Sequence, residues 1–531
     1  MNAGILAALM ALLLLIGCPG DPADDDVSGD DDVSADDDDA TDDDDDVTET
    51  PPGCLGDPGP APGPGVCADE APCRWDGNGD GAKFGYAITA GKDFDGDGLP
   101  DFAVGAKGYT EIDDEGRALL YPSTVATLDE PPSPGVFVGP QPLAYAGFSV
   151  TLVDDMDGDG LAELVVGATG VEDIPGQDLP PNVGAAYLIL GAPLPAPDPV
   201  NGQVELTPAT VFYGESYYAR TGWASAGAGD VDGDGLGDLL LSGELQNYTE
   251  EGEEYRQGRA YLFLGRAAGF DATVCTAAAD AILDGDEAGE MAGESLAGGH
   301  DLDGDEVPDL VIGAPYAGSY AGKAYVVSGA SVAGGGNFEL ANLGAVLTGD
   351  GGSYDAFGWT VASVGDLTGD GLGEIAVGVP GHDEPGSAAG ALWLYPGDPG
   401  LAQGTAPAAL TTISGEWWEH DFGIRAVGGD VDGDGSRDLV ASAIYAHQGF
   451  NGMAGRIYLF GGRDAASWAL VSSAGDADAD YTGAGVRDYL GFGLALGDLD
   501  LDGADDLLMG AAYHDTANAE DQGRVYLFWG G

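Results

Sequence analysis

The chain has 531 residues, of which 93 are glycine, and sets 93 Asp and Glu against 16 Lys and Arg, for a formal net charge of -77. This excess of negative charge excludes nucleic acid as a partner, because phosphate binding needs a basic surface. The length is too great for one ordinary core but suits a repeat architecture. Glycine far above its usual share of ~7% indicates many turns between short strands.

The first residues form an export signal. Residues 4–16 are an apolar run, too short to span a bilayer but long enough for the core of a signal peptide. The run ends in Leu15-Ile16-Gly17-Cys18, which resembles a bacterial lipobox. The resemblance implies that residues 1–17 are removed and that Cys18 carries a lipid anchor, at the outer membrane or cell surface. Since no Lys or Arg precedes the run, a plain secretory signal or an uncleaved anchor is the alternative.

Residues 18–72 are predicted to be a disordered tether, Asp-rich over residues 21–50 and then rich in Pro and Gly. Such a segment repels itself and cannot bury a core. Four cysteines besides Cys18 lie in an exported chain, where disulfides can form. These are Cys54, Cys67, Cys73 and Cys275. They allow three pairings, among which the sequence does not choose.

One nonapeptide, Asp93-Phe94-Asp95-Gly96-Asp97-Gly98-Leu99-Pro100-Asp101, recurs seven times, with copies starting at residues 93, 155, 230, 301, 366, 430 and 498. Side-chain oxygens stand at positions 1, 3, 5 and 9, and position 7 offers a backbone carbonyl. Hard cations such as Ca²⁺ prefer six or more oxygens, and glycines at positions 4 and 6 let the backbone curl around one point. The sequence therefore predicts up to seven calcium loops.

The predicted ligands, loop by loop, are Asp93, Asp95, Asp97, Leu99 and Asp101; Asp155, Asp157, Asp159, Leu161 and Glu163; Asp230, Asp232, Asp234, Leu236 and Asp238; Asp301, Asp303, Asp305, Val307 and Asp309; Asp366, Thr368, Asp370, Leu372 and Glu374; Asp430, Asp432, Asp434, Ser436 and Asp438; Asp498, Asp500, Asp502, Ala504 and Asp506. An EF-hand does not fit, because its twelfth position would fall inside a strand. Carboxylates this close repel unless a divalent ion neutralises them, so the calcium is expected to be structural.

Three departures from the pattern predict weaker binding in loops 4, 5 and 7. Glu306 replaces the second glycine of loop 4, Leu501 replaces the first glycine of loop 7, and Thr368 supplies a neutral oxygen in loop 5.

Four short apolar segments accompany each loop. One precedes it and begins with Phe-Gly or Gly, one follows it directly, a third carries Gly-x-x-Tyr, and a fourth leads to the next unit. Four-stranded units repeated seven times without a helical period indicate an all-β, seven-bladed β-propeller. The last unit lacks its fourth strand, so the N-terminal segment 73–77 is expected to complete the last blade.

This order of motifs resembles FG-GAP repeats, those of the integrin α-subunit N-terminal propeller, over residues 73–531. The resemblance implies calcium in the loops between first and second strands, on the lower face. It implies ligand binding on the upper face, made by the loops after the second and the fourth strands.

The upper loops are rich in aromatic residues and histidine, the usual anchors of recognition when they lie on loops. The candidates for the ligand face are Tyr217, Tyr218, Tyr316, Tyr354, His382, Trp417, Trp418, Tyr445, His447, Tyr513 and His514, with Tyr109, Tyr320, His420, Tyr481 and Tyr489 nearby. Many of them could instead pack under neighbouring blades.

These features predict a calcium-binding, surface-anchored adhesion or ligand-binding module for an extracellular protein or glycan, with no catalytic residue. The alternative is an exported polysaccharide hydrolase or lyase that uses the histidines of the upper loops.

Overall fold

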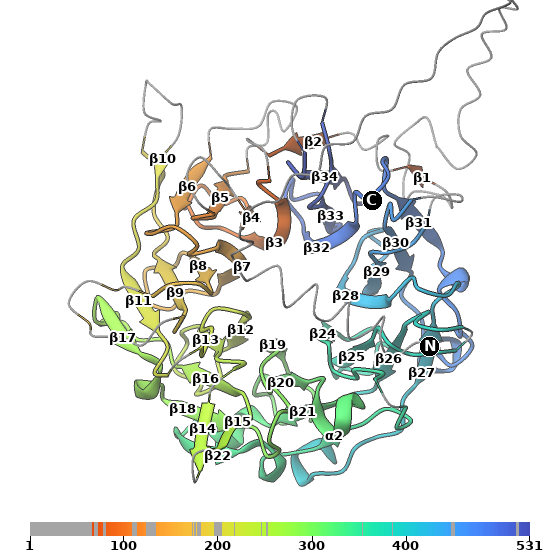
Figure 1. Ribbon diagram of the computed structural model, residues 1–531. Coiled ribbons are helices and arrows are strands. Elements are labelled where there is room, and N and C mark those ends of the chain that lie inside the picture. The colour runs from red at the N-terminus through yellow and green to blue at the C-terminus, as the bar shows by residue number, and fades with distance from the viewer. Residues whose placement is uncertain are drawn as a thin grey trace, which may run out of the picture.

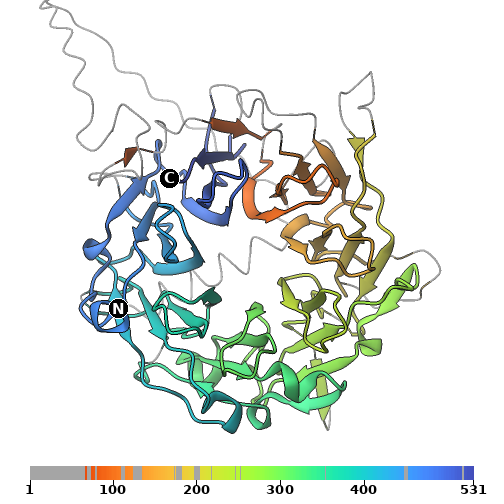
Figure 2. The ribbon, with the colours of Figure 1, turned by 180° about the vertical axis from the view of Figure 1, so that it is seen from behind.

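The computed structural model describes residues 66–67 and 73–531, apart from 78–80, 109–113, 124–133, 173, 175–176, 178–181, 196–203, 217, 246, 251–252, 353, 385, 448–451 and 517–519. The export signal, Cys18 and most of the tether lie outside these residues. Seven sheets, whose four main strands pair antiparallel, form a ring (Figures 1 and 2) around a central channel, which confirms the predicted seven-bladed β-propeller.

Each blade has four strands in chain order from the channel to the rim, except that the last blade takes its outer strand from the N-terminal part of the chain. From the channel outward, blade 1 has β3 (Phe84–Lys92), β4 (Asp101–Ala106), β5 (Arg117–Tyr121) and β6 (Gly135–Val138); blade 2 has β7 (Ala146–Val153), β8 (Glu163–Ala168), β9 (Ala185–Ile189) and β11 (Thr210–Tyr213); blade 3 has β12 (Ser225–Gly229), β13 (Asp238–Ser242), β16 (Arg259–Phe263) and β18 (Ala281–Asp284); blade 4 has β19 (Ser295–His300), β20 (Asp309–Ala314), β21 (Lys323–Val327) and β23 (Val346–Leu347); blade 5 has β24 (Thr360–Gly365), β25 (Glu374–Val379), β26 (Ala391–Tyr395) and β27 (Thr411–Ser414); blade 6 has β28 (Phe422–Gly429), β29 (Asp438–Ala443), β30 (Arg456–Phe460) and β31 (Ala479–Thr482); blade 7 has β32 (Leu490–Gly497), β33 (Asp506–Ala511), β34 (Arg524–Phe528) and β2 (Cys73–Asp76).

The ring closes between the two ends of the described chain. Strand β2 pairs antiparallel with β34, with Cys73 opposite Leu527 and Asp76 opposite Arg524. The Arg524 guanidinium also donates to the Asp76 carboxylate at 3.0 Å. The predicted completion of the last blade by the N-terminal strand is therefore confirmed, and closure removes two sheet edges that could pair with other chains.

Four blades carry a fifth strand that the sequence pattern did not predict. Strands β10 (Val204–Glu205), β17 (Thr273–Cys275), β22 (Gly336–Glu339) and β1 (Val66–Cys67) pair in parallel with β6, β11, β18 and β31. Each fifth strand lies in the segment that leads into the outermost strand of one blade, and it pairs with the outermost strand of the blade before it. That segment thus joins its own blade to the rim of the preceding one.

The remaining elements lie in connections. They are the hairpin β14 (Asn247–Glu250) and β15 (Glu253–Arg256), the helices α2 (Ala317–Tyr320), α3 (Gly329–Val332) and α4 (Ala465–Trp468), and the 3₁₀ turns η2 (Thr276–Ala278), η3 (Leu340–Asn342), η4 (Leu401–Gln403) and η5 (Ala474–Asp476). No helix in the described ranges is long and apolar enough to cross a membrane.

The second strand of every blade is buried along its whole length, because another sheet packs on each of its faces. A glycine near its end sets the spacing between blades. A Cβ on Gly378 in β25 would lie 2.0 Å from the carbonyl oxygen of Gly423, which belongs to the Phe-Gly motif of the next blade. Gly105, Gly313 and Gly510 meet the next blade in the same way, at 2.0–2.1 Å. The two glycine motifs of the repeat therefore mark one close contact between neighbouring blades.

Candidate metal loops and ligand face

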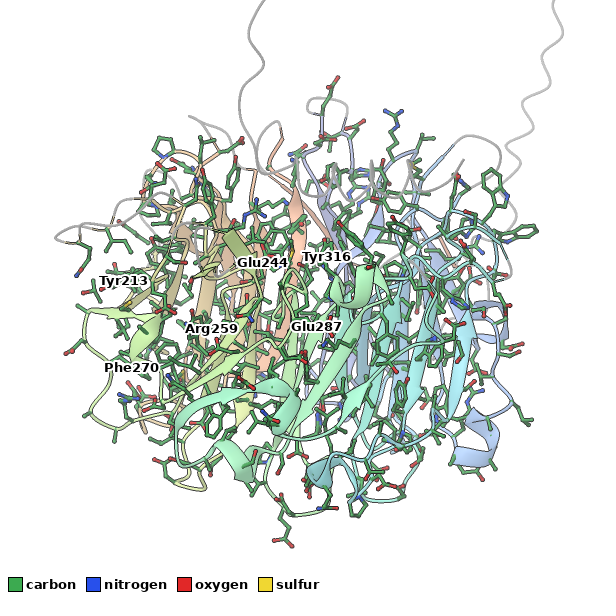
Figure 3. The ribbon with its side chains drawn as sticks, turned by 60° about the horizontal axis from the view of Figure 1, so that its bottom comes forward. Tyr213, Glu244, Arg259, Phe270, Glu287 and Tyr316 are labelled. Carbon is green, nitrogen blue, oxygen red and sulfur yellow. The ribbon has the colours of Figure 1, made fainter. Side chains whose placement is uncertain are left out.

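The seven Asp loops connect the first and second strands of their blades, so antiparallel pairing places all of them at one end of the ring. The loops that follow the second and fourth strands lie at the other end. In Figure 3, Glu244 and Tyr316, which follow second strands, lie toward the upper end of the view, and Phe270, which follows a third strand, lies lower. The two ends are called the lower and the upper face below.

The first carboxylate of each Asp loop organises the loop backbone. In loop 1, the side chain of Asp93 accepts hydrogen bonds from the backbone amides of Gly96 at 2.7 Å and Gly98 at 3.0 Å. The carboxylate of Asp95 accepts from the amide of Asp97 at 3.1 Å. In all the other copies, the carboxylate at position 1 likewise accepts a hydrogen bond from the backbone amide of position 6. The loop therefore curls around its own acidic side chains.

Positions 4 and 6 adopt the left-handed backbone conformation that favours glycine. Gly96 and Gly98 have φ values of 80° and 87°. The two residues that replace these glycines keep the conformation, with φ of 69° at Glu306 and 59° at Leu501. A side chain in this region is strained, so loops 4 and 7 keep the common shape at a cost.

The ninth carboxylate is buried and joins the loop to the body of its blade. One oxygen of Asp101 accepts from the amide of Phe94 at 2.9 Å, and the other accepts from the amide of Ser123, beyond the third strand, at 2.8 Å. The corresponding Asp residues of loops 3, 4, 6 and 7 accept the same two bonds. Burial raises the pKa of the Asp101 carboxyl to about 7.

The donor set fits a hard cation. Carboxylate oxygens of Asp155, Asp157, Asp159 and Glu163 lie within 4.8 Å of one another, and loops 1 and 3 hold similar groups. The Oε1 atom of Glu163 is buried and has no hydrogen-bond partner in the described part of the chain. Burial, and then the charge of Asp159, raises the pKa of Asp157. A divalent ion would satisfy the orphaned oxygen and relieve the repulsion between the carboxylates.

The upper face presents some of its predicted residues to solvent. Trp417 and Trp418 are 60% and 59% exposed, and Tyr218 and Tyr354 are 47% and 39% exposed. The ring of Tyr354 stacks on that of Tyr320 with centroids 5.4 Å apart. Tyr217 and Tyr109 lie outside the described residues.

Other predicted members of the ligand face are not offered to a ligand. Tyr316, His382, His420 and His514 are buried, and Tyr481 is a buried residue of β31 instead of a loop residue. Tyr445, Tyr489 and Tyr513 are partly buried against an inner hydrophobic cluster, and His447 is partly buried as well. These side chains take the alternative that the sequence left open and pack beneath their neighbours, because the upper loops fold onto one another.

The buried histidines hold neighbouring loops together. His382 and His514 stand at the same place in blades 5 and 7, and each faces an Asp from the loop that enters its blade. The Nδ1–Oδ2 distances are 3.6 Å to Asp355 and 3.0 Å to Asp488. The neighbouring Asp355 carboxylate raises the pKa of His382. In blade 6, the backbone amide of His447 donates to His420 at 3.4 Å, and burial lowers the pKa of His420 to about 4.

The Gly-x-x-Tyr strand also supports the upper face. The hydroxyl of Tyr261 donates to Glu215 at 2.9 Å, and that of Tyr458 donates to Glu416 at 3.0 Å. Arg456 donates to the same Glu416 carboxylate at 3.2 Å. Both acids lie in loops that leave the preceding blade and enter the blade of the tyrosine, so the third-strand tyrosines of blades 3 and 6 each anchor an upper loop.

Sequence reasoning missed a cavity of about 380 Å³ in the central channel. It is lined by the residue that follows the glycine of each first-strand motif. These residues are Tyr86, Phe148, Trp223, Glu294, Trp359, Ile424 and Phe492. The signal was in the sequence, since every copy of the motif has this position and five of the seven residues are aromatic.

Comparisons with known proteins agree with this architecture. The FG-GAP repeat model matches residues 84–121, 292–327, 357–395 and 490–528, which are the first three strands of blades 1, 4, 5 and 7. Integrin alpha-5 of Xenopus laevis is 29% identical over 239 residues, which are 44% of this chain and 20% of that protein. Integrin alpha-V of Gallus gallus is 30% identical over the same length and the same shares of the two chains.

Phosphatidylinositol-glycan-specific phospholipase D of Homo sapiens is also similar, 31% identical over 235 residues, which are 43% of this chain and 27% of that protein. The chain thus matches about a fifth to a quarter of the length of these relatives. Motifs, strand order and relatives agree: the chain is a seven-bladed β-propeller that contains FG-GAP repeats and is similar to the integrin α chains.

Proposed function

We propose that this protein is a calcium-stabilised, lipid-anchored propeller at the cell surface, and that its upper face binds an extracellular protein or glycan in adhesion. The observation that carries the proposal is the exposure of Trp417 and Trp418, at 60% and 59%, on an upper loop. Large aromatic side chains left in water are costly, and they are the usual anchors of a binding surface.

The two tryptophans are held in place by the neighbouring blade. The amide of Glu419, next to Trp418, donates to the carbonyl of Ser387 in an upper loop of blade 5 at 2.8 Å. In the same way, the amide of Ala356 donates to the carbonyl of Tyr320 at 2.9 Å, beside the stacked pair Tyr320 and Tyr354. Such bonds organise the exposed rings before a ligand arrives, which lowers the entropy cost of binding.

Calcium would be held by the side chains at positions 1, 3, 5 and 9 of the Asp loops, with the backbone carbonyl of position 7. Bound there, the ion neutralises clustered carboxylates and couples metal binding to folding. Its role is structural, because the upper face lies at the opposite end of the strands.

A lipid on Cys18 fits the N-terminal pattern, and export fits the integrin names among the relatives. The extended acidic segment after Cys18 would lift the propeller away from the membrane. Metabolic labelling of the full chain with a fatty acid tests the anchor, with Cys18→Ser as the control that should abolish the label.

An exported enzyme is the second candidate, and one relative bears the name of a phospholipase D. The burial of His382, His420 and His514 argues against it, since a general acid or base must reach its substrate. A binding module therefore accounts better for the upper face.

The test is a binding screen against glycans and surface proteins, run in calcium and again with chelator. A hit should lose more than about tenfold in affinity in the double variant Trp417→Ala, Trp418→Ala, because central aromatic anchors contribute ~2 kcal/mol or more each. Leu470→Ala is the matched control, since Leu470 is 80% exposed at the opposite end of its blade. An equal loss in the control, or no loss in the tryptophan variant, would overturn the proposal.

A further inference from the structure

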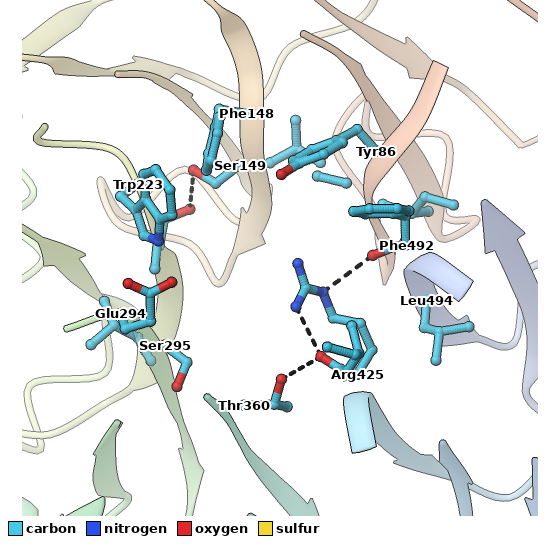
Figure 4. A pocket seen from close by; sticks show the side chains of 18 of the residues that line it. Tyr86, Phe148, Ser149, Trp223, Glu294, Ser295, Thr360, Arg425, Phe492 and Leu494 are labelled. Carbon is cyan, nitrogen blue, oxygen red and sulfur yellow. Dashed lines mark hydrogen bonds between the residues drawn. The ribbon is translucent and has the colours of Figure 1, made fainter. Parts of the chain in front are cut away.

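The central channel contains a closely lined cavity that neither the metal loops nor the upper face uses. Five aromatic side chains from five blades surround it, together with Glu294, Ile424 and Arg425. Its volume of about 380 Å³ is that of a small-molecule site. Figure 4 shows Arg425 and Glu294 on different sides of this space, with the rings of Trp223, Phe148, Tyr86 and Phe492 along one edge of it.

Two basic side chains lie on one side of the cavity. The Arg425 guanidinium donates only to backbone carbonyls, from Nε to Phe492 at 3.1 Å and from Nη1 to Ile424 at 2.9 Å. Among the described residues it forms no ion pair with a carboxylate. Lys107, only 4% exposed, lies close by with its Nζ 3.6 Å from the ring centroid of Tyr86 and 4.5 Å from that of Phe148. This side of the channel therefore favours an anion.

An acidic group lies on another side. Glu294 is the one acidic member of the seven-residue ring, and the Trp223 side chain donates a hydrogen bond to it. Burial raises the pKa of the Glu294 carboxyl to about 8. The carboxylate and the guanidinium of Arg425 influence each other electrostatically, yet they form no ion pair.

A charged group that is buried away from a counter-ion destabilises a fold, since burial removes hydration that nothing replaces. Arg425 lacks a carboxylate partner among the described residues, and the raised pKa of Glu294 shows that its charged form lacks a counter-ion as well. The two groups face a cavity that is lined by aromatic rings together with aliphatic and hydroxyl side chains. A ligand that carries both an anion and a cation on a short apolar frame would satisfy both.

We infer that the channel binds a free α-amino acid with an aromatic or aliphatic side chain. The α-carboxylate pairs with Arg425, the α-ammonium pairs with Glu294, and the side chain packs among the rings of Trp223, Trp359 and Phe492. This site is distinct from the proposed ligand face and does not depend on it, because none of these residues lies among the exposed side chains of the upper loops.

Isothermal titration of the calcium-loaded protein with L-phenylalanine and L-leucine tests the site. Both should bind, whereas phenethylamine, 3-phenylpropionate and N-acetyl-L-phenylalanine amide should each bind about tenfold more weakly or worse, because each lacks a charge that one side of the cavity needs. No measurable binding of either amino acid would overturn the inference, and so would equal binding of the amine or of the blocked amide. This series uses the unaltered protein, so it does not depend on any variant folding.

Two variants test which side chain pairs with the ammonium and which with the carboxylate of the ligand. Glu294→Gln should remove the preference for L-phenylalanine over 3-phenylpropionate, and Arg425→Gln should weaken the binding of both by about tenfold or more. Arg463→Gln, which removes an ion pair with Asp478 at the rim, is the control and should bind like the unaltered protein. If Arg425→Gln melts like the unaltered protein and binds L-phenylalanine equally well, the assignment of the carboxylate is wrong.

Discussion

The two ends of the same strands follow opposite rules. At the lower face, seven loops repeat one acidic pattern, one backbone shape and one buried ninth carboxylate. At the upper face, the side chains of the loops range from the buried His382 to Trp417 at 60% exposure, and no single pattern recurs in all blades. A pattern that repeats in all seven blades belongs to the part that holds the ring together. A loop that differs between blades is one in which a single blade can acquire a role that the others lack.

If the lower face is the structural end, removal of divalent ions should have the largest effect on stability. We expect the melting temperature, measured by calorimetry, to fall on the order of 10 °C when calcium is replaced by chelator, because up to seven sites each contribute binding free energy to the folded state. Added calcium should restore it. An unchanged melting temperature would show that the Asp loops do not need a metal.

Disturbing the glycine contact between neighbouring blades should destabilise the protein almost as much as removing the metal. Gly378→Ala places a Cβ 2.0 Å from the carbonyl oxygen of Gly423. We expect a loss of ~3 kcal/mol in the free energy of unfolding, because neighbouring sheets cannot separate without disturbing both blades. Gly334→Ala is the control, since a Cβ there meets nothing within 4 Å. Equal denaturation midpoints for the two variants would contradict this account of the glycine motif.

Within one loop, the ninth and third positions should separate structural from metal-dependent stability. Asp238 accepts hydrogen bonds from the backbone amides of Val231 at 2.7 Å and Gly265 at 2.8 Å. In Asp238→Asn, an NH₂ group replaces one of the two acceptor oxygens, so one of these backbone N–H groups loses its acceptor. We expect a loss of about 1–3 kcal/mol both with calcium and with chelator.

Asp232→Asn at the third position should behave differently. It should destabilise the protein in calcium but not in chelator, because burial and the neighbouring charges of Asp234 and Asp230 already disfavour its carboxylate when no ion is bound. Calorimetry of both variants in both buffers makes the comparison. A third-position variant that is equally destabilised in chelator would mean that the loop carboxylates stabilise the fold without metal.

The repeat made the lower half of the molecule predictable and left the upper half open. The Asp loops, their flanking strands and the closure by residues 73–77 follow from motifs that recur in fixed order. The fifth strands do not, because segments such as Val204–Glu205 pair through backbone groups and share no side-chain pattern. The burial of His382 and Tyr316 depends on how adjacent loops fold onto each other, which no local pattern encodes. The charges in the channel emerge only when Glu294 and Arg425 are brought together from different blades.

A smaller effect should appear where a loop departs from its own pattern. Leu501 is 55% exposed and has φ of 59°, a conformation that glycine adopts without strain. Leu501→Gly should therefore stabilise the protein by up to ~1 kcal/mol, the relief of backbone strain being partly offset by the greater freedom of glycine in the unfolded chain. Leu501→Ala keeps the Cβ and should bring no gain. If both variants have the same unfolding free energy, strain at this position does not limit loop 7.

The smallest effect on stability is expected at the upper face. Trp417 and Trp418 are more than half exposed, so replacing both with alanine removes little buried area and should shift the melting temperature by no more than about 1 °C. The same double variant is the one expected to lose ligand binding, which separates it from every lower-face variant. If it instead melted several degrees lower, the two rings would be part of the packing between blades 5 and 6. The contrast between a structural lower face and a specialised upper face would then fail at the residues on which it chiefly depends.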